Sequence, residues 1–319
     1  TKEEEHALQA ESHAEIEQAA EAYSKMPPQE PETMFSYLYA APPGSSGNDN
    51  GFQDRSTASE TTRLGAVNLA LARAMKDEAS VIVLGEDVGV NGGVFRATDG
   101  LADTYGLERV RDTRLAEAAL AGLSVGLAAQ GIRPIAEIQF EGFMFPTLDQ
   151  LVNHASRLRT RTRGRLTCPM VLRAPYGGGI HAPEHHSDSV EAFYAHIPGL
   201  RVVIPSTPER AYGLLLASIR DPDPVVFLEP KRIYRSSKGA VTDDGQAIAL
   251  DRCFIDREGR DVTLIGWGAI TNELATAAEI LAVEGISAET IDVATLYPLN
   301  DEAICRSVDK TGRVIIVHE

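Results

Sequence analysis

The 319-residue sequence has few cysteines and no long apolar run. Its three cysteines, Cys168, Cys253 and Cys305, lie far apart and form no C-x-x-C pair. This spacing argues against a disulfide framework and a cysteine-based zinc site, and it favours a reducing compartment. No apolar run approaches the ~20 residues that a membrane-spanning helix needs, so we expect no membrane segment.

Basic residues are also scarce. The chain has 30 Lys and Arg against 46 Asp and Glu, which gives a formal net charge of −16. Because non-specific nucleic-acid binding depends on Lys and Arg displacing counterions, this balance argues against a nucleic-acid partner. Hydrophobic residues make up 43%, which is ordinary for a globular protein, and the length predicts one large or two medium domains.

Composition divides the chain into four stretches. We expect a helical segment over residues 1–41 and a flexible linker over 42–59, where Gly, Ser, Asn and Asp dominate. Residues 60–236 predict a first α/β domain, and residues 237–319 predict a second one that is incomplete, because only three strands are visible. The chain starts inside a charged helical pattern and stops on an apolar strand, so both ends look cut and an upstream targeting peptide stays open.

The first α/β stretch alternates continuous apolar strands with helices. Strands of this kind suit a parallel sheet that is buried on both faces, and their alternation with helices predicts an α/β fold with a mainly parallel sheet. The expected strands are 81–87, 134–140, 169–175, 201–206 and 224–230, and the expected helices are near 62–76, 116–130, 148–161 and 208–219.

Three of the eight histidines lie in GGGIHAPEHHSDS, residues 177–189. His181, Glu184 and His185 spell H-x-x-E-H, a pattern of one class of zinc peptidases. In such sites both histidines lie one helical turn apart on one helix face. Here Pro183 and the preceding glycines favour a loop, and no third ligand is evident. A zinc hydrolase therefore remains only as an alternative.

Carboxylates form another group of candidates. Glu86 and Asp87 end an apolar strand, and ligands of open α/β sheets gather at the carboxyl ends of strands. Glu117 lies in the apolar stretch DTRLAEAALAG, where pattern alone predicts a surface carboxylate on the first turn of a helix. The glycine runs at 89–95 and 176–180 match neither a P-loop nor a dinucleotide fingerprint, so turns are their favoured role.

Five segments in this order carry a family resemblance: LGEDVGVNGGVFRATDGL (84–101), RVRDTRLAEAALAG (109–122), RPIAEIQFEGFMFPTLDQ (133–150), LRAPYGGG…HHSDS (172–189) and IPGLRVVIPSTP…IRDPDPVVFLEPKRIYR (197–235). They resemble the β subunit of the thiamine-diphosphate-dependent, decarboxylating component of 2-oxo acid dehydrogenase complexes. The likeness covers about residues 62–319. Residues 1–40 resemble the C-terminal tail of the partner α subunit, which implies an α–β fusion through the linker.

The resemblance implies a fold and an activity. The fold is a parallel-sheet pyrimidine-binding domain followed by a transketolase C-terminal-like domain. The activity is oxidative decarboxylation of a 2-oxo acid on thiamine diphosphate, with acyl transfer to the lipoyl groups of a dihydrolipoyl acyltransferase core, in an α₂β₂-like heterotetramer. Its compartment is the cytoplasm, or the mitochondrial matrix in a eukaryote.

The substrate and the role of the chain stay open between alternatives. The stretch APEHHSDS resembles pyruvate-type relatives more than the branched-chain type, so we favour pyruvate and keep branched-chain 2-oxo acids second. A non-catalytic module that docks the α subunit to the core, and a transketolase-like or acetoin-cleaving enzyme, remain as further alternatives.

The resemblance also assigns the site. Glu117 becomes the carboxyl that hydrogen-bonds the cofactor's pyrimidine ring, in a place apolar enough to raise its pKa. Phe143 matches the aromatic residue that packs on the pyrimidine, Leu115 a neighbouring wall and Glu86 a second acid. His186, which immediately precedes Ser-Asp-Ser, matches the catalytic histidine.

Two metals are implied in the same way. In the family the α subunit holds Mg²⁺ and the diphosphate with a G-D-G…N motif, and this sequence has no G-D-G. The resemblance therefore predicts that the chain alone does not turn over. A structural K⁺ site, made mostly of backbone carbonyls, falls on Met170, Ser218, Ile219, Asp221 and Asp223; relatives often have Asn in place of Asp223.

Overall fold

The computed structural model describes residues 1–40 and 58–319. These residues form two compact units, Thr1–Tyr37 and Leu38–Glu319. The flexible linker expected over 42–59 lies almost entirely outside the described residues. Within the described part, no helix combines the length and apolar character that a membrane span needs.

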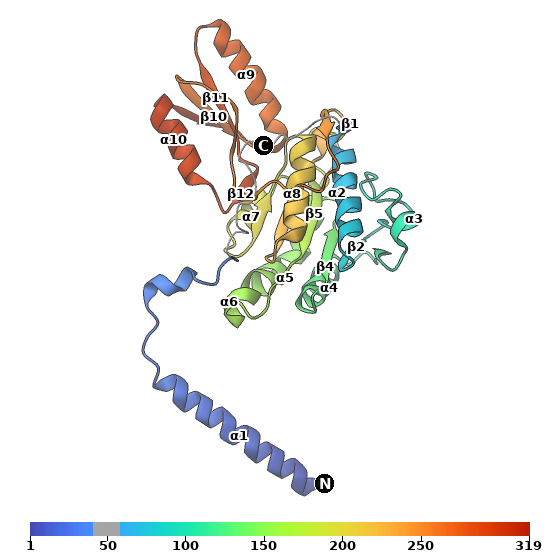
Figure 1. Cartoon of the computed structure of the whole chain (residues 1–319), viewed down its shortest axis with the longest axis vertical. Helices are drawn as coiled ribbons and strands as arrows, with labels where there is room; N and C mark the ends of the chain where they lie inside the picture. The colour runs from blue at the N-terminus through green and yellow to red at the C-terminus, as the bar shows by residue number, and fades with distance from the viewer. Residues whose placement is uncertain (41–57) are drawn as a thin grey trace. The chain divides into compact units, whose positions relative to one another are not determined.

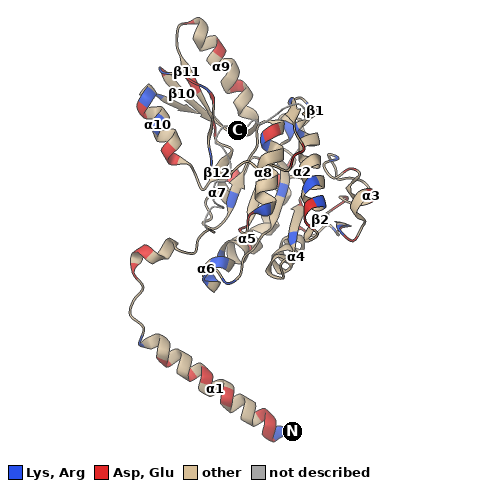
Figure 2. Cartoon of the chain, in the orientation of Figure 1, with Lys and Arg blue, Asp and Glu red and all other residues tan. Residues whose placement is uncertain are grey.

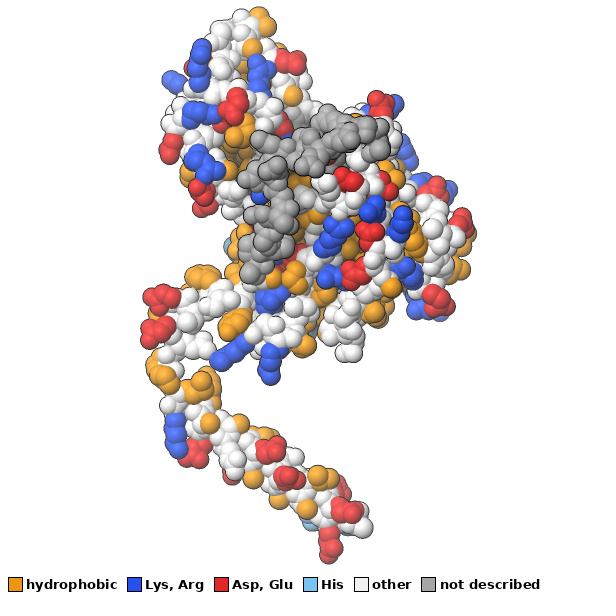
Figure 3. Space-filling model, viewed as in Figure 1, with side chains coloured by type: hydrophobic (Ala, Val, Ile, Leu, Met, Phe, Trp, Pro, Cys, Tyr) orange, Lys and Arg blue, Asp and Glu red, His pale blue; other side chains and the backbone are white. Residues whose placement is uncertain are grey.

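The smaller unit consists of one long helix and a short 3₁₀ turn. Helix α1 (Lys2–Ser24) begins with a capping box, in which the Thr1 side chain accepts a hydrogen bond from the Glu4 backbone N–H and the Glu4 side chain binds back to Thr1. None of its residues is buried. Figure 2 shows acidic residues at intervals along α1, and Figure 3 shows apolar side chains between them. The 3₁₀ turn η1 spans Pro31–Phe35.

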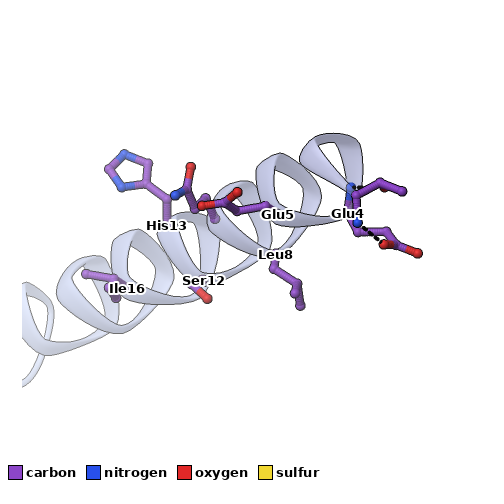
Figure 4. Close-up of a pocket in the computed structure, with 8 residues that line it drawn as sticks. Glu4, Glu5, Leu8, Ser12, His13 and Ile16 are labelled. Carbon is purple, nitrogen blue, oxygen red and sulfur yellow. Dashed lines mark hydrogen bonds and ion pairs between the residues drawn. The ribbon is translucent and has the colours of Figure 1, made fainter.

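A shallow hollow follows α1, between side chains that include Leu8, His13 and Ile16 (Figure 4). All of its walls come from this one helix. A ligand there would be covered on one side only, so the hollow is a groove between neighbouring side chains and not a candidate site.

The larger unit is built on a seven-stranded sheet with the strand order β12-β6-β7-β5-β4-β2-β3. All neighbouring strands are parallel except the edge strand β12, which runs antiparallel to β6. A separate antiparallel pair joins β1 to β8. These findings confirm the predicted α/β fold with a mainly parallel sheet. The bounds are β1 (Ser59–Thr62), β2 (Val81–Gly85), β3 (Val110–Asp112), β4 (Arg133–Glu137), β5 (Val171–Tyr176), β6 (Arg201–Val203), β7 (Val225–Pro230), β8 (Lys238–Val241) and β12 (Thr295–Tyr297).

Helices cover both faces of the large sheet (Figure 1). Because side chains alternate along a strand, Val171 of β5 joins the core under α2 and α8, while Leu172 joins the opposite core under α4, α5 and α7. Thr62 and Thr207 cap the N-termini of α2 and α8 with their side chains. The bounds are α2 (Arg63–Asp77), α3 (Leu101–Tyr105), α4 (Glu117–Ala129), α5 (Leu148–Asn153), α6 (Leu158–Thr162), α7 (Glu191–Ala195) and α8 (Pro208–Arg220).

The helix expected near 148–161 is interrupted. His154 has φ −122° and ψ −67°, and the 3₁₀ turn η5 (Ala155–Arg157) separates α5 from α6. The turn buries Ser156, whose carbonyl oxygen lies where a side chain on Gly199 would project. The chain therefore leaves the helical path where it packs closely against the loop at Gly199. Other 3₁₀ turns are η3 (Glu141–Phe143), η4 (Phe145–Thr147), η6 (Lys231–Ile233) and η7 (Gly268–Ile270).

The C-terminal part forms a four-stranded sheet with the order β13-β10-β11-β9. Leu274 on α9 packs on one face of this sheet, and Ile304 on α10 packs on the other. The stretch 287–296 holds two strands, because β11 ends at Asp292 and β12 then crosses to the large sheet. The bounds are β9 (Phe254–Arg257), β10 (Val262–Gly266), β11 (Ala288–Asp292), β13 (Val314–Ile316), α9 (Thr271–Val283) and α10 (Asp301–Thr311).

Candidate active site

Polar side chains gather where the parallel strands of the large sheet end. Glu86 directly follows β2, Glu137 ends β4, and the glycine-rich segment starting at Gly177 directly follows β5. Since these strands are neighbours and parallel, their carboxyl ends meet at one edge. This edge is where ligands of open α/β sheets bind.

A small pocket at this edge brings three of the predicted residues together. Glu86, Leu115 and Glu117 all line it, and so does Glu137. Burial raises the pKa of Glu86, and the nearby charges of Asp87 and Glu117 raise it further. Glu117 therefore lies close enough to influence the ionisation of Glu86.

Glu117 is the first residue of α4 and is half-buried. Leu115, two residues earlier, has 72% of its surface exposed. The apolar enclosure expected around Glu117 is thus only partly supplied by this chain. A carboxylate at the first turn of a helix still experiences the positive end of the helix dipole, as the sequence pattern predicted.

His186 packs in an aromatic nest that contains the predicted Phe143. The centroid of the His186 ring lies 5.1 Å from that of Phe143 and 4.5 Å from that of Phe140. Phe140 and Phe143 themselves lie edge to face at 5.7 Å. Phe140 directly follows two pocket residues, Ile138 and Gln139, so the nest continues the wall of the pocket. The sequence prediction missed Phe140, although it follows β4 in the same segment as Phe143.

The hydrogen bonds of His186 fix which ring nitrogen is available. Its Nδ1 lies 2.8 Å from the carbonyl oxygen of Glu184. Because a carbonyl only accepts hydrogen bonds, Nδ1 donates its proton, and Nε2 carries the lone pair of the neutral ring. The free nitrogen can then take up or supply a proton at a substrate.

The segment around His186 is a loop, as predicted, and not a zinc-binding helix. His181 and His185 both have left-handed backbones, with φ 54° and 65°. His185 lies 3.6 Å from Asp188 and 3.5 Å from Glu184 in ion-pair geometry. In residues 1–40 and 58–319, no three His, Cys, Asp or Glu side chains are grouped to bind a metal.

A buried ion-pair group lies beneath the pocket and was not predicted. Arg173 of β5 donates hydrogen bonds to Glu137 of β4 and to both carboxylate oxygens of Glu229 of β7, the latter at 2.7 and 2.8 Å. The Tyr234 hydroxyl also donates to Glu229. A side chain on Gly93 would collide with Glu137, so this glycine lets the loop after β2 lie on the group. The only sequence signal is a charge inside each of three apolar strands.

The five residues expected to bind K⁺ do not suit that ion here. Arg133 Nη1 donates to the carbonyl oxygens of Ile219 and Asp221, at 2.9 and 3.1 Å. The carboxylate of Asp223 accepts hydrogen bonds from Arg159 at 2.5 Å, from Arg201 at 3.5 Å and from the Ala40 N–H at 2.6 Å. The oxygens that would hold a cation already serve arginines, whose positive charge repels one. Of the remaining two, Met170 has a carbonyl oxygen that accepts from the Val225 N–H at 3.0 Å, and Ser218 has a hydroxyl that donates to the Leu214 carbonyl at 2.7 Å.

Comparisons with known proteins agree with this geometry. Residues 60–237 match the family described as "Transketolase, pyrimidine binding domain", and residues 251–319 match "Transketolase, C-terminal domain". A solved structure, "Split gene transketolase, inactive beta4 tetramer", has a TM-score of 0.64 at 22% identity and covers 81% of this chain and 79% of its own. At that identity the likeness bears on the fold alone.

Curated relatives are much more similar in sequence. Pyruvate dehydrogenase E1 component subunit beta of Acholeplasma laidlawii is 52% identical over 258 residues, which is 81% of this chain and 79% of the relative. The 2-oxoisovalerate dehydrogenase subunit beta of Bacillus subtilis is 49% identical over 254 residues, 80% of this chain and 78% of the relative. The pyruvate dehydrogenase E1 component subunit beta of the same species is 48% identical over 260 residues, 82% of this chain and 80% of the relative.

Proposed function

The chain belongs to the family of 2-oxo acid dehydrogenase β subunits, and we propose that it supplies the pyrimidine side of a thiamine diphosphate site that oxidatively decarboxylates pyruvate. The observation that carries the proposal is the meeting of two clusters at one sheet edge. Glu86, Leu115 and Glu117 line the pocket, and His186 packs on Phe143 beside its wall.

The pocket suits an aromatic ring that carries a hydrogen-bonding nitrogen. Leu115 offers an apolar surface, and Glu117 offers a carboxyl group at the same opening. Thiamine diphosphate, when bound, supplies the nucleophilic carbon that adds to a 2-oxo acid and stabilises the charge left when CO₂ departs. Glu117 would hold a proton at the ring nitrogen of its pyrimidine, and Phe143 would pack against that ring.

Glu86 would join Glu117 in the proton network of the site. Burial and the charges of Asp87 and Glu117 raise the pKa of Glu86, so Glu86 favours its neutral form more than an ordinary glutamate does. Covering this opening with a partner surface would strengthen the effect, since lower solvation favours the neutral carboxyl.

His186 acts on the substrate side. The hydrogen bond from its Nδ1 to the Glu184 carbonyl orients the ring, and Phe140 and Phe143 fix its plane. Its Nε2 can therefore orient the 2-oxo acid and supply a proton to the departing sulfur when the lipoyl disulfide opens and takes up the acyl group.

The proposal includes partners. An α-type subunit would hold the diphosphate and Mg²⁺, because this sequence has no G-D-G motif, and the lipoyl groups would come from the dihydrolipoyl acyltransferase core of the complex. Residues 1–40 would be the tail of the α part. Three free cysteines, Cys168, Cys253 and Cys305, suit a reducing compartment such as the cytoplasm, or the matrix in a eukaryote.

The first test measures the reaction of the chain together with an α-type partner. Reduction of an artificial electron acceptor is followed with pyruvate and with 2-oxoisovalerate, with and without thiamine diphosphate and Mg²⁺. We expect cofactor-dependent turnover that is faster with pyruvate. Faster turnover with 2-oxoisovalerate would favour the branched-chain alternative, and no turnover by folded protein would favour the docking-module alternative.

The second test assigns the two central residues. Glu117→Gln and His186→Ala should each lower lipoyl acylation at least about 100-fold, the range of a lost acid–base group, without unfolding the protein. The matched control is His181→Asn, which removes an imidazole from the same loop and keeps a residue that tolerates φ 54°. Near-normal acylation by either variant would contradict the role proposed for that residue.

A further inference from the structure

Two buried glutamates bracket the His186 loop. Glu141 opens η3, the turn that also carries Phe143, and its Oε2 accepts a hydrogen bond from the Val190 N–H at 3.3 Å, just past the loop. Glu191 is the next residue and the first of α7. Its Oε1 accepts a hydrogen bond from Trp267 Nε1, in the C-terminal part, at 3.0 Å. The two side chains thus connect the aromatic nest, the end of the loop and the C-terminal part.

Each carboxyl has one oxygen without a partner. Glu141 Oε1 and Glu191 Oε2 are buried, and the described residues offer neither of them a hydrogen bond. The hydroxyl of Tyr194 is buried and unpartnered in the same way. Leaving such atoms unpaired is costly, and two ionised carboxylates in one buried place would be costlier still.

The nearby charges do not cancel the repulsion between the carboxyls of Glu141 and Glu191. Burial raises the pKa of Glu141 well above its ordinary value, and the charge of Glu191 raises it further, followed by that of Asp188. Lys231 acts in the opposite direction, but its ammonium donates to the Gly177 carbonyl at the other end of the loop. Both acids also act on the buried hydroxyl of Tyr176, whose pKa is raised chiefly by burial.

We propose that Glu141 keeps its proton and that Glu141 and Glu191 act as positioning residues that fix the His186 loop. With Glu141 neutral, the buried pair does not carry two negative charges, and the carboxyl oxygens keep their bonds to Val190 and Trp267. Oε1 of Glu141, which has no other partner among the described residues, can carry the proton.

Loss of that proton would loosen the loop. An ionised Glu141 would then be buried near the Glu191 carboxyl, and its move toward solvent would take η3 away from Val190. Phe143 lies on one of the two segments joined by that contact and His186 on the other, so their 5.1 Å packing depends on it. The alkaline limit of activity would therefore depend partly on Glu141.

The first experiment uses the single tryptophan as a probe. Trp267 is the only tryptophan in the sequence, and its indole N–H binds Glu191, so its fluorescence should report ionisation of the neighbouring Glu141. His318 stacks on the same indole at 5.2 Å. The parent is compared with Glu141→Gln, Glu141→Gln/Glu191→Gln and Glu279→Gln, which removes an exposed carboxyl on α9.

We expect one fluorescence step in the parent and in Glu279→Gln that is missing from Glu141→Gln and from the double variant. Stability should follow the same pattern. Because the folded chain keeps a proton that the unfolded chain releases above about pH 4.5, the contribution of Glu141 to parent stability falls as pH rises, and Glu141→Gln escapes this fall. Identical fluorescence steps in all four proteins, or parallel stability profiles, would overturn the proton on Glu141.

The positioning role rests on the function proposed for His186. The fluorescence and stability measurements test the protonation alone, because they need neither substrate nor cofactor. In the assembled complex, Glu141→Gln should keep pyruvate turnover within about threefold near neutral pH and move the alkaline fall of kcat upward, because its amide stays neutral. If Glu141→Gln has lost the fluorescence step but its kcat falls at the same alkaline pH as that of the parent, the positioning role is overturned. No turnover by the parent would instead count against the proposed function.

Discussion

Removing the buried guanidinium of Arg173 should destabilise the chain strongly at neutral pH. Arg173 is 1% exposed and is the cation between Glu137 and Glu229, which are 5% and 0% exposed. Arg173→Met keeps much of the aliphatic length but leaves two buried carboxylates without the guanidinium that hydrogen-bonds both. Removing one partner of a buried ion pair costs about 3–5 kcal/mol.

Proton uptake limits the loss and gives it a pH dependence. Burial raises the pKa of Glu137 above its ordinary 4.5 even though Arg173 lowers it, so without Arg173 the pKa rises further. Protonating a carboxyl of pKa 4.5 at pH 7 costs about 3.4 kcal/mol, and at pH 5.5 only about 1.4 kcal/mol. We therefore expect a loss of about 4 kcal/mol at pH 7 that shrinks by about 2 kcal/mol at pH 5.5.

Urea unfolding of parent and variant at the two pH values measures this loss, provided that the m-values agree. The control is Glu137→Gln/Arg173→Met/Glu229→Gln, which removes all three charges and should recover most of the stability, because an apolar or neutral replacement of a whole buried group is often tolerated. A loss below about 1 kcal/mol at pH 7, or a larger loss at pH 5.5 than at pH 7, would refute the reasoning.

Two further substitutions have definite expected outcomes. Gly199→Ala should lower the free energy of unfolding, measured in urea, by at least about 2 kcal/mol. The reason is that φ is +90° and the new Cβ would lie 2.2 Å from the Ser156 carbonyl oxygen. Gly126→Ala, at an open helical position, is the control. Burial raises the pKa of Asp292 to about 6, although Arg210 lowers it, so its protonated form contributes stability that is lost as pH rises from about 4 to 6. Asp292→Asn should remove up to about 3 kcal/mol of that pH dependence, and an unchanged pH profile would contradict this.

The architecture could be predicted where hydrophobic patterns are long. Strands such as β2, β5 and β7 are continuous apolar runs, and the α/β fold that they predict is confirmed. Strands β3 and β12 have three residues each and no apolar run, so no periodic signal marks them. The break at His154 arises from packing against Gly199, a contact distant in sequence that local composition does not encode.

The candidate site, like the fold, could be predicted only in part from the sequence. Glu117 and His186 came from motif resemblance, and pattern alone would have left Glu117 as a surface carboxylate; their roles stay predictions. The shared pocket and the aromatic nest needed the fold, because Phe143 and His186 lie 43 positions apart in the sequence. Arg173 and Glu141 were missed because a charge in an apolar stretch identifies no partner until the strands are aligned.

The crossing of β12 into the large sheet affects how the chain is made. Thr295–Tyr297 pairs with β6 on the edge of a sheet whose other strands all lie before residue 231. During synthesis, the ribosome must therefore add every residue up to Tyr297 before that edge is covered. Until then β6 presents an open edge, which can pair with another nascent chain. Fast elongation through residues 232–297, or a chaperone on β6, would shorten that exposure.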